Sequence, residues 1–310
     1  MSELHVVFGA GGGAGGAVAR ELASRGLAVR AVTRSGRTDL PPGVENVRAD
    51  ATDPVAARRS VEGASVVYHC LNVPYAEWDT TLPQAMTSLI AAAGDAGAKL
   101  VYCDNLYMYG PVDGPMREDL PSAASTRKGR LRARIAETLL GAHAAGRVRA
   151  AIGRGSDFYG PGATNTIAGQ LVFPAIVAGK KAHWVGALDA PHTLSYIEDF
   201  ARGLVTLATD DRALGGIWHI PAAAPITGRD FIALAFEVAG KPPKIGLHPR
   251  WMMSLVALFS RNMREIVEVL YQFERPFVLD ASRFTTTFGE LGVTDHRTAI
   301  RRTLAAMGRR

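Results

Sequence analysis

The sequence predicts an α/β fold, a doubly wound Rossmann-type parallel sheet with a smaller C-terminal lobe. Three observations support this prediction. Short apolar segments alternate with helical patterns through the first half of the 310 residues. The first segment, which begins at Leu4, runs directly into a glycine-rich turn and then an alanine-rich helical pattern. In the second half, proline and glycine become frequent and the patterns irregular, which favours a separate small lobe.

The elements of the first half follow from these patterns. Parallel strands that are buried on both faces read as short apolar runs, and the longer segments between them have the period of helices. The expected strands are residues 4–9, 28–33, 46–49, 65–70, 99–103 and 148–153, and the expected helices are 14–25, 54–61, 79–96 and 125–145. Ligands of such folds bind at the carboxyl ends of the strands, so the loops that follow these strands should line a site.

The domain organisation follows the same change of character. We expect residues 1–155 to form the Rossmann domain and residues 195–220 to return to it. Residues 156–194 and 221–310 should form the smaller lobe, which in such proteins binds the substrate.

The glycine run after the first strand carries the most information. Gly9, Gly12 and Gly15 have the spacing GxxGxxG, and the run also reads as GxGxxG in a frame that starts at Gly11, or as GxGxxA in a frame that starts at Gly9 with Gly11 second. Such glycines let the backbone approach a pyrophosphate, which the free N–H groups of the first helical turn bind. A merely flexible loop would not explain the helix that follows. The sequence therefore predicts dinucleotide binding by the turn, with these contacts: Gly9, Gly12, Gly13, Ala14 and Gly15.

Composition and charge exclude several classes of protein. The net charge is +6, but the basic residues are scattered and show no nucleic-acid-binding motif, so we expect a basic surface and no nucleic-acid partner. No apolar run is long enough for stable membrane insertion. The two cysteines argue against a disulfide framework, and the histidines have no metal-ligand spacing, so no metal site is expected. The first strand begins almost at once, which leaves no room for a signal peptide, and we expect a cytoplasmic protein.

The end of the second strand favours NADP(H) over NAD(H). NAD-binding folds usually carry a carboxylate there, whereas this chain has Thr33, Arg34, Ser35 and Arg37. A carboxylate would repel a 2′-phosphate, and an arginine fork can hold one. The alternative is that Arg34 and Arg37 are only surface residues.

Other strand ends supply further candidate cofactor contacts. Asp50 follows the third strand and could accept a hydrogen bond from an adenine amino group, or could be a turn residue, while Asp53 before Pro54 could cap a helix. The strand ends are expected to complete the cofactor site with Asp50, Ala51, Cys70, Leu71, Asn72 and Ser156.

Taken together, these motifs resemble the short-chain dehydrogenase/reductase superfamily, in particular its extended branch, the NAD(P)-dependent epimerase/dehydratase family. The segments that carry the likeness are VFGAGGGAGG, RADATDP, VYCDNLYMYGP, RGSDFYGPG and HTLSYIEDFARGL, which span most of the chain. The resemblance implies the fold, a nicotinamide cofactor and a small-molecule substrate. It does not imply one particular reaction.

The chain departs from the family in its catalytic motif. In the family, a serine or threonine orients the substrate, and a tyrosine transfers a proton to or from it. A lysine at the spacing YxxxK lowers the pKa of that tyrosine and holds the nicotinamide ribose. None of the eight tyrosines here has a lysine four positions later. Matching the YGP segment places Asn105 at the serine position, and matching the helix through Glu137 places Gly129 and Ala133 at the tyrosine and lysine positions. The chain thus resembles atypical members that have lost part of the usual set.

Replacements for the missing groups are sought near the strand ends. Tyr107 could reach inward or simply pack, and Lys128 could bind the cofactor ribose or substrate or be a solvated first-turn residue. With Asn105 they form the predicted catalytic set. Further candidates, each with a structural alternative, are Tyr109, the carboxylate Asp104, His69, Asp157, Tyr159 and His192.

Two features fit no single role. Cys70 and Cys103 end neighbouring strands and could be a redox pair, although two small core residues in a reducing compartment explain them better. The apolar segment 251–259 and the amphipathic stretch after it could be a lid or a homodimer surface, with attachment to a membrane surface less favoured than ordinary packing.

The sequence therefore predicts an NADP(H)-dependent oxidoreductase or epimerase with a nonstandard site, acting on a small carbonyl or alcohol substrate. Two alternatives stay open. One is a non-catalytic NADP(H)-binding sensor or interaction protein, and the other is a lyase or isomerase that makes no net redox change.

Overall fold

The computed structural model describes residues 3–308, and its main feature is a seven-stranded sheet in which every pairing is parallel. The strand order is β11-β6-β5-β4-β1-β2-β3, which is the doubly wound arrangement that the sequence predicts. The strands are β1 (Leu4–Phe8), β2 (Ala28–Thr33), β3 (Glu45–Arg48), β4 (Ala64–His69), β5 (Lys99–Asp104), β6 (Arg149–Arg154) and β11 (Ile217–His219). The six expected strands are confirmed, with ends within about one residue of their predicted positions.

The strand order reverses at β1, and this reversal positions the glycine turn. β1 pairs with β2 on one side, Val6 opposite Arg30, and with β4 on the other, Val6 opposite Val67. The chains that leave β1 and β4 therefore diverge to opposite faces and leave a crevice at the carboxyl ends of these strands. The glycine turn follows Phe8 and lies at this edge.

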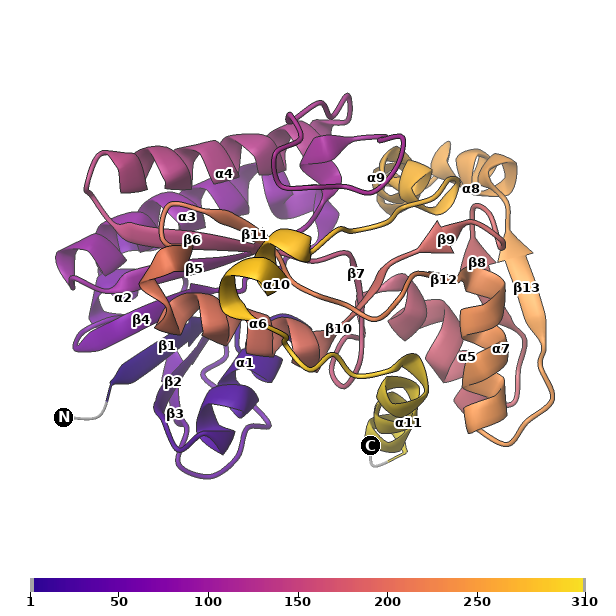
Figure 1. The fold of residues 1–310 in the computed structure, drawn as a ribbon, viewed down its shortest axis with the longest axis horizontal. Helices are drawn as coiled ribbons and strands as arrows, with labels where there is room; N and C mark the ends of the chain where they lie inside the picture. The colour runs from indigo at the N-terminus through magenta and orange to yellow at the C-terminus, as the bar shows by residue number, and fades with distance from the viewer. Residues whose placement is uncertain (1–2, 309–310) are drawn as a thin grey trace.

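Two helical layers cover the sheet (Figure 1). One layer consists of α2 (Pro54–Ser60), α3 (Trp78–Asp95) and α4 (Arg127–Ala144), and the other contains α1 (Gly13–Ser24) and α6 (Ile197–Thr209). Each helix presents apolar side chains to the sheet, so a separate hydrophobic core lies on each face. The four helices expected in the first half are confirmed.

Side-chain caps fix where two of these helices begin. Asp53 accepts a hydrogen bond from the Val55 backbone N–H at 2.9 Å, and Pro54 occupies the first turn of α2. Thr126 accepts from the Gly129 N–H at 3.1 Å and starts α4. The predicted capping role of Asp53 is thereby confirmed.

The second half forms a smaller lobe, to the right in Figure 1. Its core packs aromatic side chains such as Tyr159, Trp184 and Phe231. Its helices are α5 (Phe173–Val177), α7 (Gly228–Val238), α8 (Arg250–Ala257), α9 (Arg261–Glu268) and α11 (His296–Met307), and its small strands are β7 (Asp157–Tyr159), β8 (Ala182–Val185), β9 (Pro191–His192), β10 (Leu194–Tyr196), β12 (Ile226–Thr227) and β13 (Ile245–His248).

The chain crosses between the two parts more than once. After β10, helix α6 packs on the sheet and β11 extends it by pairing with β6, Trp218 opposite Gly153. Later, α10 (Ser282–Phe288) returns to the sheet side, where Phe288 packs on Trp218 with ring centroids 4.7 Å apart. Among residues 3–308, no helix is long and apolar enough to cross a membrane.

Candidate cofactor and substrate site

The glycine turn after β1 leaves no room for side chains. Gly9 has a φ of +82°, and a Cβ there would lie 2.5 Å from the carbonyl oxygen of Cys70 at the end of β4. A Cβ on Gly15 would collide with the backbone of Gly9, which folds back over the first turn of α1. Glycine is therefore required at both positions, because any other residue would push the turn away from the sheet.

The N-terminus of α1 is shaped to receive an anion. Gly12 is its N-cap residue, and no side chain caps the helix. Gly13 lies beneath the loop that follows β7, where its added Cβ would be 3.1 Å from Ala163 Cα. The first-turn N–H groups and the helix dipole thus face the crevice at the sheet edge, which is the arrangement that binds a pyrophosphate.

The loop after β2 begins with exposed cations, and its one carboxylate, Asp39, comes later in the loop. Arg34 and Arg37 are both exposed, and neither makes a side-chain hydrogen bond or ion pair within residues 3–308. The Thr33 hydroxyl accepts from the Gly36 N–H at 2.9 Å and shapes the turn. Two free guanidinium groups therefore stand where a ribose of a bound dinucleotide would lie.

Asp50 is committed to a turn at the end of β3. Its Oδ1 accepts from the Thr52 N–H at 2.9 Å and from the Thr52 hydroxyl at 2.8 Å. These hydrogen bonds lower the pKa of Asp50, and the charge of Arg34 adds to the effect. Asp50 therefore stays ionised next to Arg34, and the neighbouring Ala51 is buried in the core.

The strand ends on the nicotinamide side contain buried polar atoms that lack partners. His69, at the end of β4, has no partner for Nε2, and burial lowers its pKa to about 3. The Ser156 hydroxyl, after β6, is buried and also lacks a partner within the described residues. Solvent exposure increases along the three residues after β4: Cys70 is buried, Leu71 is half-buried and Asn72 is exposed. A ligand with polar groups, such as a nicotinamide ribose, would satisfy the orphaned atoms, so these residues fit a dinucleotide.

Cys70 and Cys103 lie side by side. His69 is opposite Tyr102 in the β4–β5 ladder, so the next residues of the two strands are neighbours. A hydrogen bond that the Cys70 thiol donates to Cys103, together with burial, raises the pKa of Cys70 well above its usual value. Both cysteines are free thiols that pack against one sheet face, as the core interpretation predicts.

Tyr107 is a buried candidate proton donor. Its hydroxyl is 2.9 Å from the Tyr75 hydroxyl and 3.5 Å from Gln272 Nε2. Burial raises the pKa of Tyr107 well above its usual value and that of Tyr75 to about 12. Asn105 accepts from the Tyr107 backbone N–H at 3.1 Å and so fixes the turn between β5 and Tyr107.

Lys128 is buried rather than solvated. Only 1% of its surface is exposed, and its ammonium forms ion pairs with Glu265 and, at 3.0 Å, with Glu268 of α9. The same ammonium lies 4.9 Å from the centre of the Tyr75 ring. The interpretation of Lys128 as a solvated first-turn residue is therefore wrong, because α9 folds over the start of α4.

The position that matches the family tyrosine cannot accept a side chain. A Cβ on Gly129 would lie 2.5 Å from the carbonyl oxygen of Tyr107 and would also collide with the side chain of Ala124. The turn that carries Tyr107 thus occupies the space that a tyrosine at position 129 would need. The local backbone therefore requires glycine at position 129.

Other sequence candidates hold the structure together. The two Asp104 carboxylate oxygens are engaged by Arg132 at 3.4 Å and by Arg154 at 3.1 Å, which leaves this carboxylate no opening to a substrate. Arg154 donates to the Tyr109 hydroxyl at 2.7 Å, and this hydroxyl lies 2.8 Å from His219 Nε2. Tyr159 packs within the core of the smaller lobe.

His192 and Asp157, which the sequence treats separately, form a pair. His192 Nε2 lies 2.8 Å from an Asp157 carboxylate oxygen. The imidazole is buried between the rings of Phe273 and Phe277, at centroid distances of 4.8 and 5.2 Å. The stacking fixes the orientation of this pair, which joins the start of β7 to the end of β9.

Sequence reasoning missed Tyr75, Gln272, Glu265 and Glu268. They come from segments far from the recognised motifs, and only the fold brings them to Tyr107 and Lys128. The one available signal was the amphipathic stretch after residue 259, which contains three of them.

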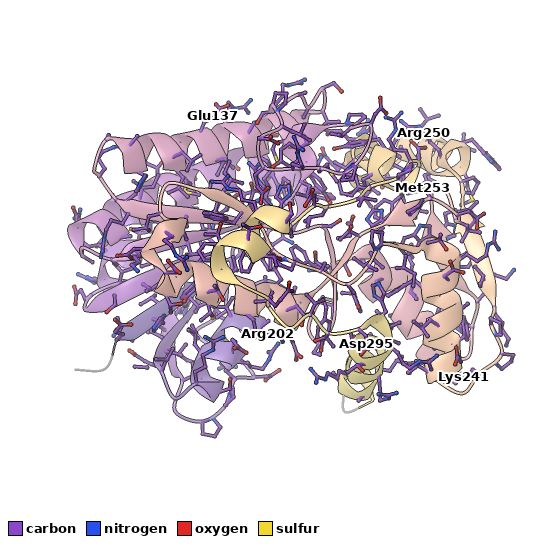
Figure 2. The ribbon with its side chains drawn as sticks, in the orientation of Figure 1. Glu137, Arg202, Lys241, Arg250, Met253 and Asp295 are labelled. Atoms are coloured by element: carbon purple, nitrogen blue, oxygen red, sulfur yellow. The ribbon has the colours of Figure 1, made fainter. Side chains whose placement is uncertain are left out.

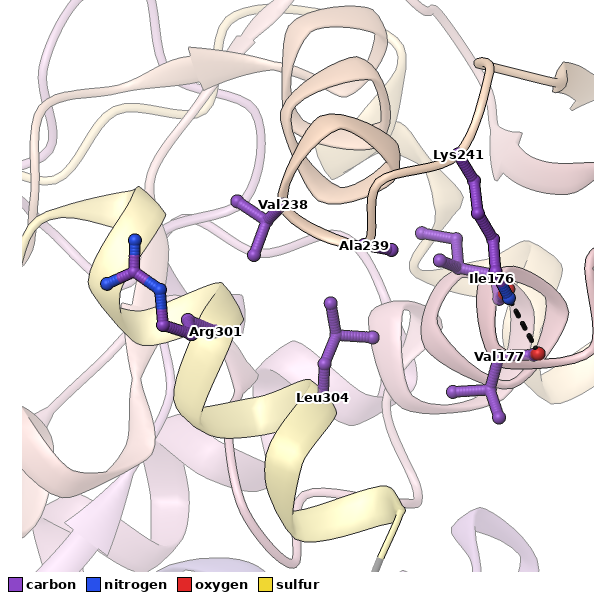
Figure 3. A pocket seen from close by; sticks show the side chains of 7 residues that line it. All are labelled: Ile176, Val177, Val238, Ala239, Lys241, Arg301 and Leu304. Carbon is purple, nitrogen blue, oxygen red and sulfur yellow. Dashed lines mark hydrogen bonds between the residues drawn. The ribbon is translucent and has the colours of Figure 1, made fainter.

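Two cavities lie away from this site. One, of about 250 Å³, lies between α5, α7 and α11, where Lys241 donates to the Val177 carbonyl at 2.9 Å (Figure 3). The other, of about 340 Å³, lies beside β3 at the sheet edge. Neither contains a residue of the glycine turn. No cluster of three or more potential metal ligands occurs in the part of the chain that the structure describes.

Comparisons with known proteins agree with this geometry. The model of the NAD dependent epimerase/dehydratase family matches residues 5–220. Among solved structures, MoeE5 in complex with UDP-glucose and NAD is 19% identical, with a TM-score of 0.80 and 99% of each chain covered. No curated protein matches the sequence.

Two further solved structures share the fold. UDP-glucose 4-epimerase from Thermus thermophilus in complex with NAD is 18% identical, with a TM-score of 0.78, and the match covers 98% of this chain and 99% of the other. The dTDP-glucose 4,6-dehydratase from Bacillus anthracis in complex with NAD is 14% identical, with a TM-score of 0.82 and coverage of 99% and 97%. These neighbours hold NAD, whereas the loop after β2 led us to expect NADP(H). The family match covers more than two thirds of the chain, so this protein belongs to the NAD dependent epimerase/dehydratase family and is an NAD(P)-dependent enzyme of the short-chain dehydrogenase/reductase type.

Proposed function

We propose that the protein is an NADP(H)-dependent oxidoreductase or epimerase that acts on a small carbonyl or alcohol substrate through a nonstandard catalytic site. The observation that carries this proposal is the Tyr107–Tyr75 hydroxyl pair, 2.9 Å apart, at the carboxyl end of β5. It places a proton donor at the edge of the sheet where the glycine turn would hold a cofactor.

The chain's own residues would hold the cofactor along this edge. Backbone N–H groups at Gly13 and Ala14 bind the pyrophosphate, while the Gly12 N–H donates to the Gly9 carbonyl at 2.9 Å and shapes the turn, and the carboxyl ends of β4 and β6 accommodate the nicotinamide side. Asp50 and Ala51 border the adenine. When bound, the cofactor accepts or supplies the hydride at nicotinamide C4.

Tyr107 is the proposed acid. Its raised pKa keeps the phenol protonated at neutral pH, so it can donate a proton to a carbonyl oxygen as hydride arrives. The Tyr75 hydroxyl then returns a proton to Tyr107 along the existing hydrogen bond, and solvent reprotonates the half-buried Tyr75. Asn105 holds the turn that orients Tyr107.

Lys128 is a proposed positioning residue. Two carboxylates already neutralise its ammonium, so it is not free to bind a substrate anion. Its ammonium lies 4.9 Å from the centre of the Tyr75 ring and so helps to hold this ring beside Tyr107. In this chain, a tyrosine and a lysine from different elements thus take up part of the task of the missing motif.

The preference for NADP(H) rests on Arg34 and Arg37. Both guanidinium groups are exposed and without ion pairs in the described residues, and no carboxylate directly follows β2, where an NAD-binding fold usually has one; Asp39 comes later in the loop. A guanidinium binds a 2′-phosphate through charge-assisted hydrogen bonds. The neighbouring structures contain NAD, so the preference needs a direct test.

The first part of the test is calorimetry with NADPH, NADP⁺, NADH and NAD⁺. We expect NADP(H) to bind at least about tenfold more tightly than NAD(H), and Arg34→Ala to remove most of that difference. Arg59→Ala, which changes an exposed arginine on α2, is the matched control. Equal affinities, or tighter binding of NAD(H), would overturn the choice of cofactor.

The second part is turnover on a panel of aldehydes, ketones and secondary alcohols. We expect Tyr107→Phe to lower kcat by about 10²-fold or more while calorimetric cofactor binding is unchanged. Product without net change in nicotinamide absorbance would identify epimerisation or another isomerisation. Unchanged turnover in Tyr107→Phe would refute the site. Tight cofactor binding with no turnover on any substrate would favour a sensor, a role that the closed space at Gly129 also suits.

A further inference from the structure

Helix α8 and the residue pair after it expose a group of large apolar side chains. Here we call Trp251, Leu255, Val256, Leu258 and Phe259 the α8 face, and their exposed fractions run from 45% to 89%. Elsewhere in residues 3–308, the exposed large apolar side chains are Val55, Val177 and Leu247. Apolar groups are thus concentrated within nine consecutive residues, whereas single exposed ones are the norm for a protein surface.

The α8 face results from helical spacing. Trp251, Leu255 and Leu258 follow one another at intervals of four and three residues and so share one side of the helix. The opposite side buries Met253 and Ala257 against the smaller lobe. The helix lies at the outer end of that lobe, where Arg250 and Met253 are labelled (Figure 2). A helix that is apolar on both sides needs a second apolar environment.

The charged residues in the sequence on both sides of this face are all basic. The sequence from residue 238 to residue 264 contains no aspartate or glutamate and five lysines and arginines, namely Lys241, Lys244, Arg250, Arg261 and Arg264. Arg250 pairs with Glu274, whereas Arg264 is exposed and makes no ion pair in the described part of the chain. The first acidic residues of α9, Glu265 and Glu268, turn inward to Lys128. Lys241 and Lys244 donate to the carbonyls of Val177 and Gly179, away from α8 (Figure 2), so the described cations at the rim of the face are Arg250 and Arg264.

We propose that the α8 face docks on the surface of an anionic lipid bilayer. An apolar helix face with cations at its rim is the arrangement of interfacial helices, and tryptophan suits the boundary between lipid and water. Anionic lipid complements the cations. A second copy of the chain fits less well, because one eight-residue helix offers less than the roughly 800 Å² per partner of a standard interface.

Trp251 provides a direct readout. The other three tryptophans, Trp78, Trp184 and Trp218, are buried, so a vesicle-induced blue shift of fluorescence reports the one on the α8 face. We expect the wild-type protein to sediment with phosphatidylcholine vesicles that contain a quarter phosphatidylglycerol, and to bind pure phosphatidylcholine about tenfold less. Raising the salt concentration to about 0.5 M should weaken the binding, because it screens the cations.

Substitutions distinguish vesicle binding by the α8 face from nonspecific binding by other exposed apolar residues. Leu255→Ser with Phe259→Ser should reduce vesicle binding about tenfold or more and abolish the blue shift, whereas Trp251→Phe should lose the shift and keep most of the binding. Val55→Ser with Val177→Ser removes comparable exposed groups elsewhere and should bind like wild type. Binding to anionic vesicles no stronger than to neutral ones would overturn the proposal. So would a concentration-dependent dimer that shields Trp251 from acrylamide without lipid.

Discussion

At the scale of single residues, the carboxyl end of the sheet is held by a buried polar network. Asp104 lies between Arg132 and Arg154, and Arg154 continues through Tyr109 to His219. The five groups come from separate segments, so their hydrogen bonds fix the relative positions of β5, β6, β11 and α4. Loss of any one partner would leave a buried charge or polar atom unsatisfied, which makes the network sensitive to protonation.

His219 is the titratable group of this network that acts in the mildly acidic range. Burial lowers its pKa from 6.5 to about 4, and the nearby charge of Arg154 contributes, while the Asp280 carbonyl opposes the shift. The unfolded chain therefore takes up a proton near pH 6.5 that the folded protein takes up only near pH 4. The contribution of His219 to stability is fully present above about pH 6.5 and is lost as the pH falls toward 4.

We predict that His219→Gln flattens this dependence. Between pH 6 and pH 5, the free energy of unfolding of the wild type should fall by up to about 1.4 kcal/mol through this residue, and the variant should lose that part of the slope. Urea titrations at pH 7.5, 6 and 5 measure it, with His248→Gln as control. Glu118 and His69 also titrate abnormally, but they are present in both proteins. An unchanged slope in the variant would show that His219 is not the group responsible.

Residues of the site differ in how far the sequence could predict them. The glycines are set by local backbone geometry, so their spacing alone identifies the turn, and Gly9 and Gly15 indeed have no room for a Cβ. The environment of Lys128 depends on Glu265, 137 residues later in the chain, and no local pattern encodes that contact. The Tyr75–Tyr107 pair likewise joins two loops that only the sheet order brings together.

At the scale of elements, α9 fastens the smaller lobe to the Rossmann domain. Glu265 accepts from both Arg127 and Lys128 at the start of α4, and Arg127 also pairs with Asp79 of α3. The segment that follows α9 carries Gln272 to the Tyr107 hydroxyl. The ion pairs thus hold α9 and the segment after it over Tyr107, the proposed proton donor.

We predict that Glu265→Gln loosens this attachment. Lys128 would stay buried with Glu268 as its one remaining carboxylate, and removal of a partner from a buried pair typically costs about 3–5 kcal/mol, less here because Glu268 remains. Amide hydrogen exchange should become faster in residues 263–273 and stay unchanged in β4 and β5. Glu237→Gln, which breaks an exposed pair with Arg297, is the control and should leave both regions as they are. Uniform acceleration across the chain would contradict a local role.

Element boundaries followed the sequence closely in the first half and poorly in the second. Continuous apolar strands, a glycine turn and the caps Asp53 and Thr126 are local signals, and they set β1 through α4. The smaller lobe is built from strands of two to four residues and from the π-helical turn Ala168–Val172, whose form depends on tertiary packing. Their pairing partners lie far away in the chain, as with Ile245 opposite Ala182.

At the scale of the whole molecule, three cores meet around the candidate site. Trp78 lies in the core under α3 and α4, Trp218 in the core under α1 and α6, and Trp184 in the core of the smaller lobe. The loop after β7 connects them, because Ala163 packs on Gly13 at the start of α1. A dinucleotide in the glycine turn would contact both sides of this junction.

This arrangement predicts that cofactor stabilises both parts of the molecule together. At a free NADPH concentration about 100 times Kd, the free energy of unfolding should rise by about 2.7 kcal/mol, because only the folded state binds. Urea unfolding followed by tryptophan fluorescence and by far-UV circular dichroism should shift equally. At the same NADPH concentration, the unfolding transition of Arg34→Ala should shift less than that of the wild type. It should shift fully when the NADPH concentration is raised to the same multiple of the variant's own Kd. A triple variant, Trp78→Phe with Trp218→Phe and Trp251→Phe, leaves Trp184 as its one tryptophan, so its fluorescence reports unfolding of the smaller lobe alone. If NADPH shifted the unfolding midpoint measured by circular dichroism but left the midpoint of this fluorescence unchanged, the smaller lobe would unfold independently. The junction at Gly13 would then not couple the two parts.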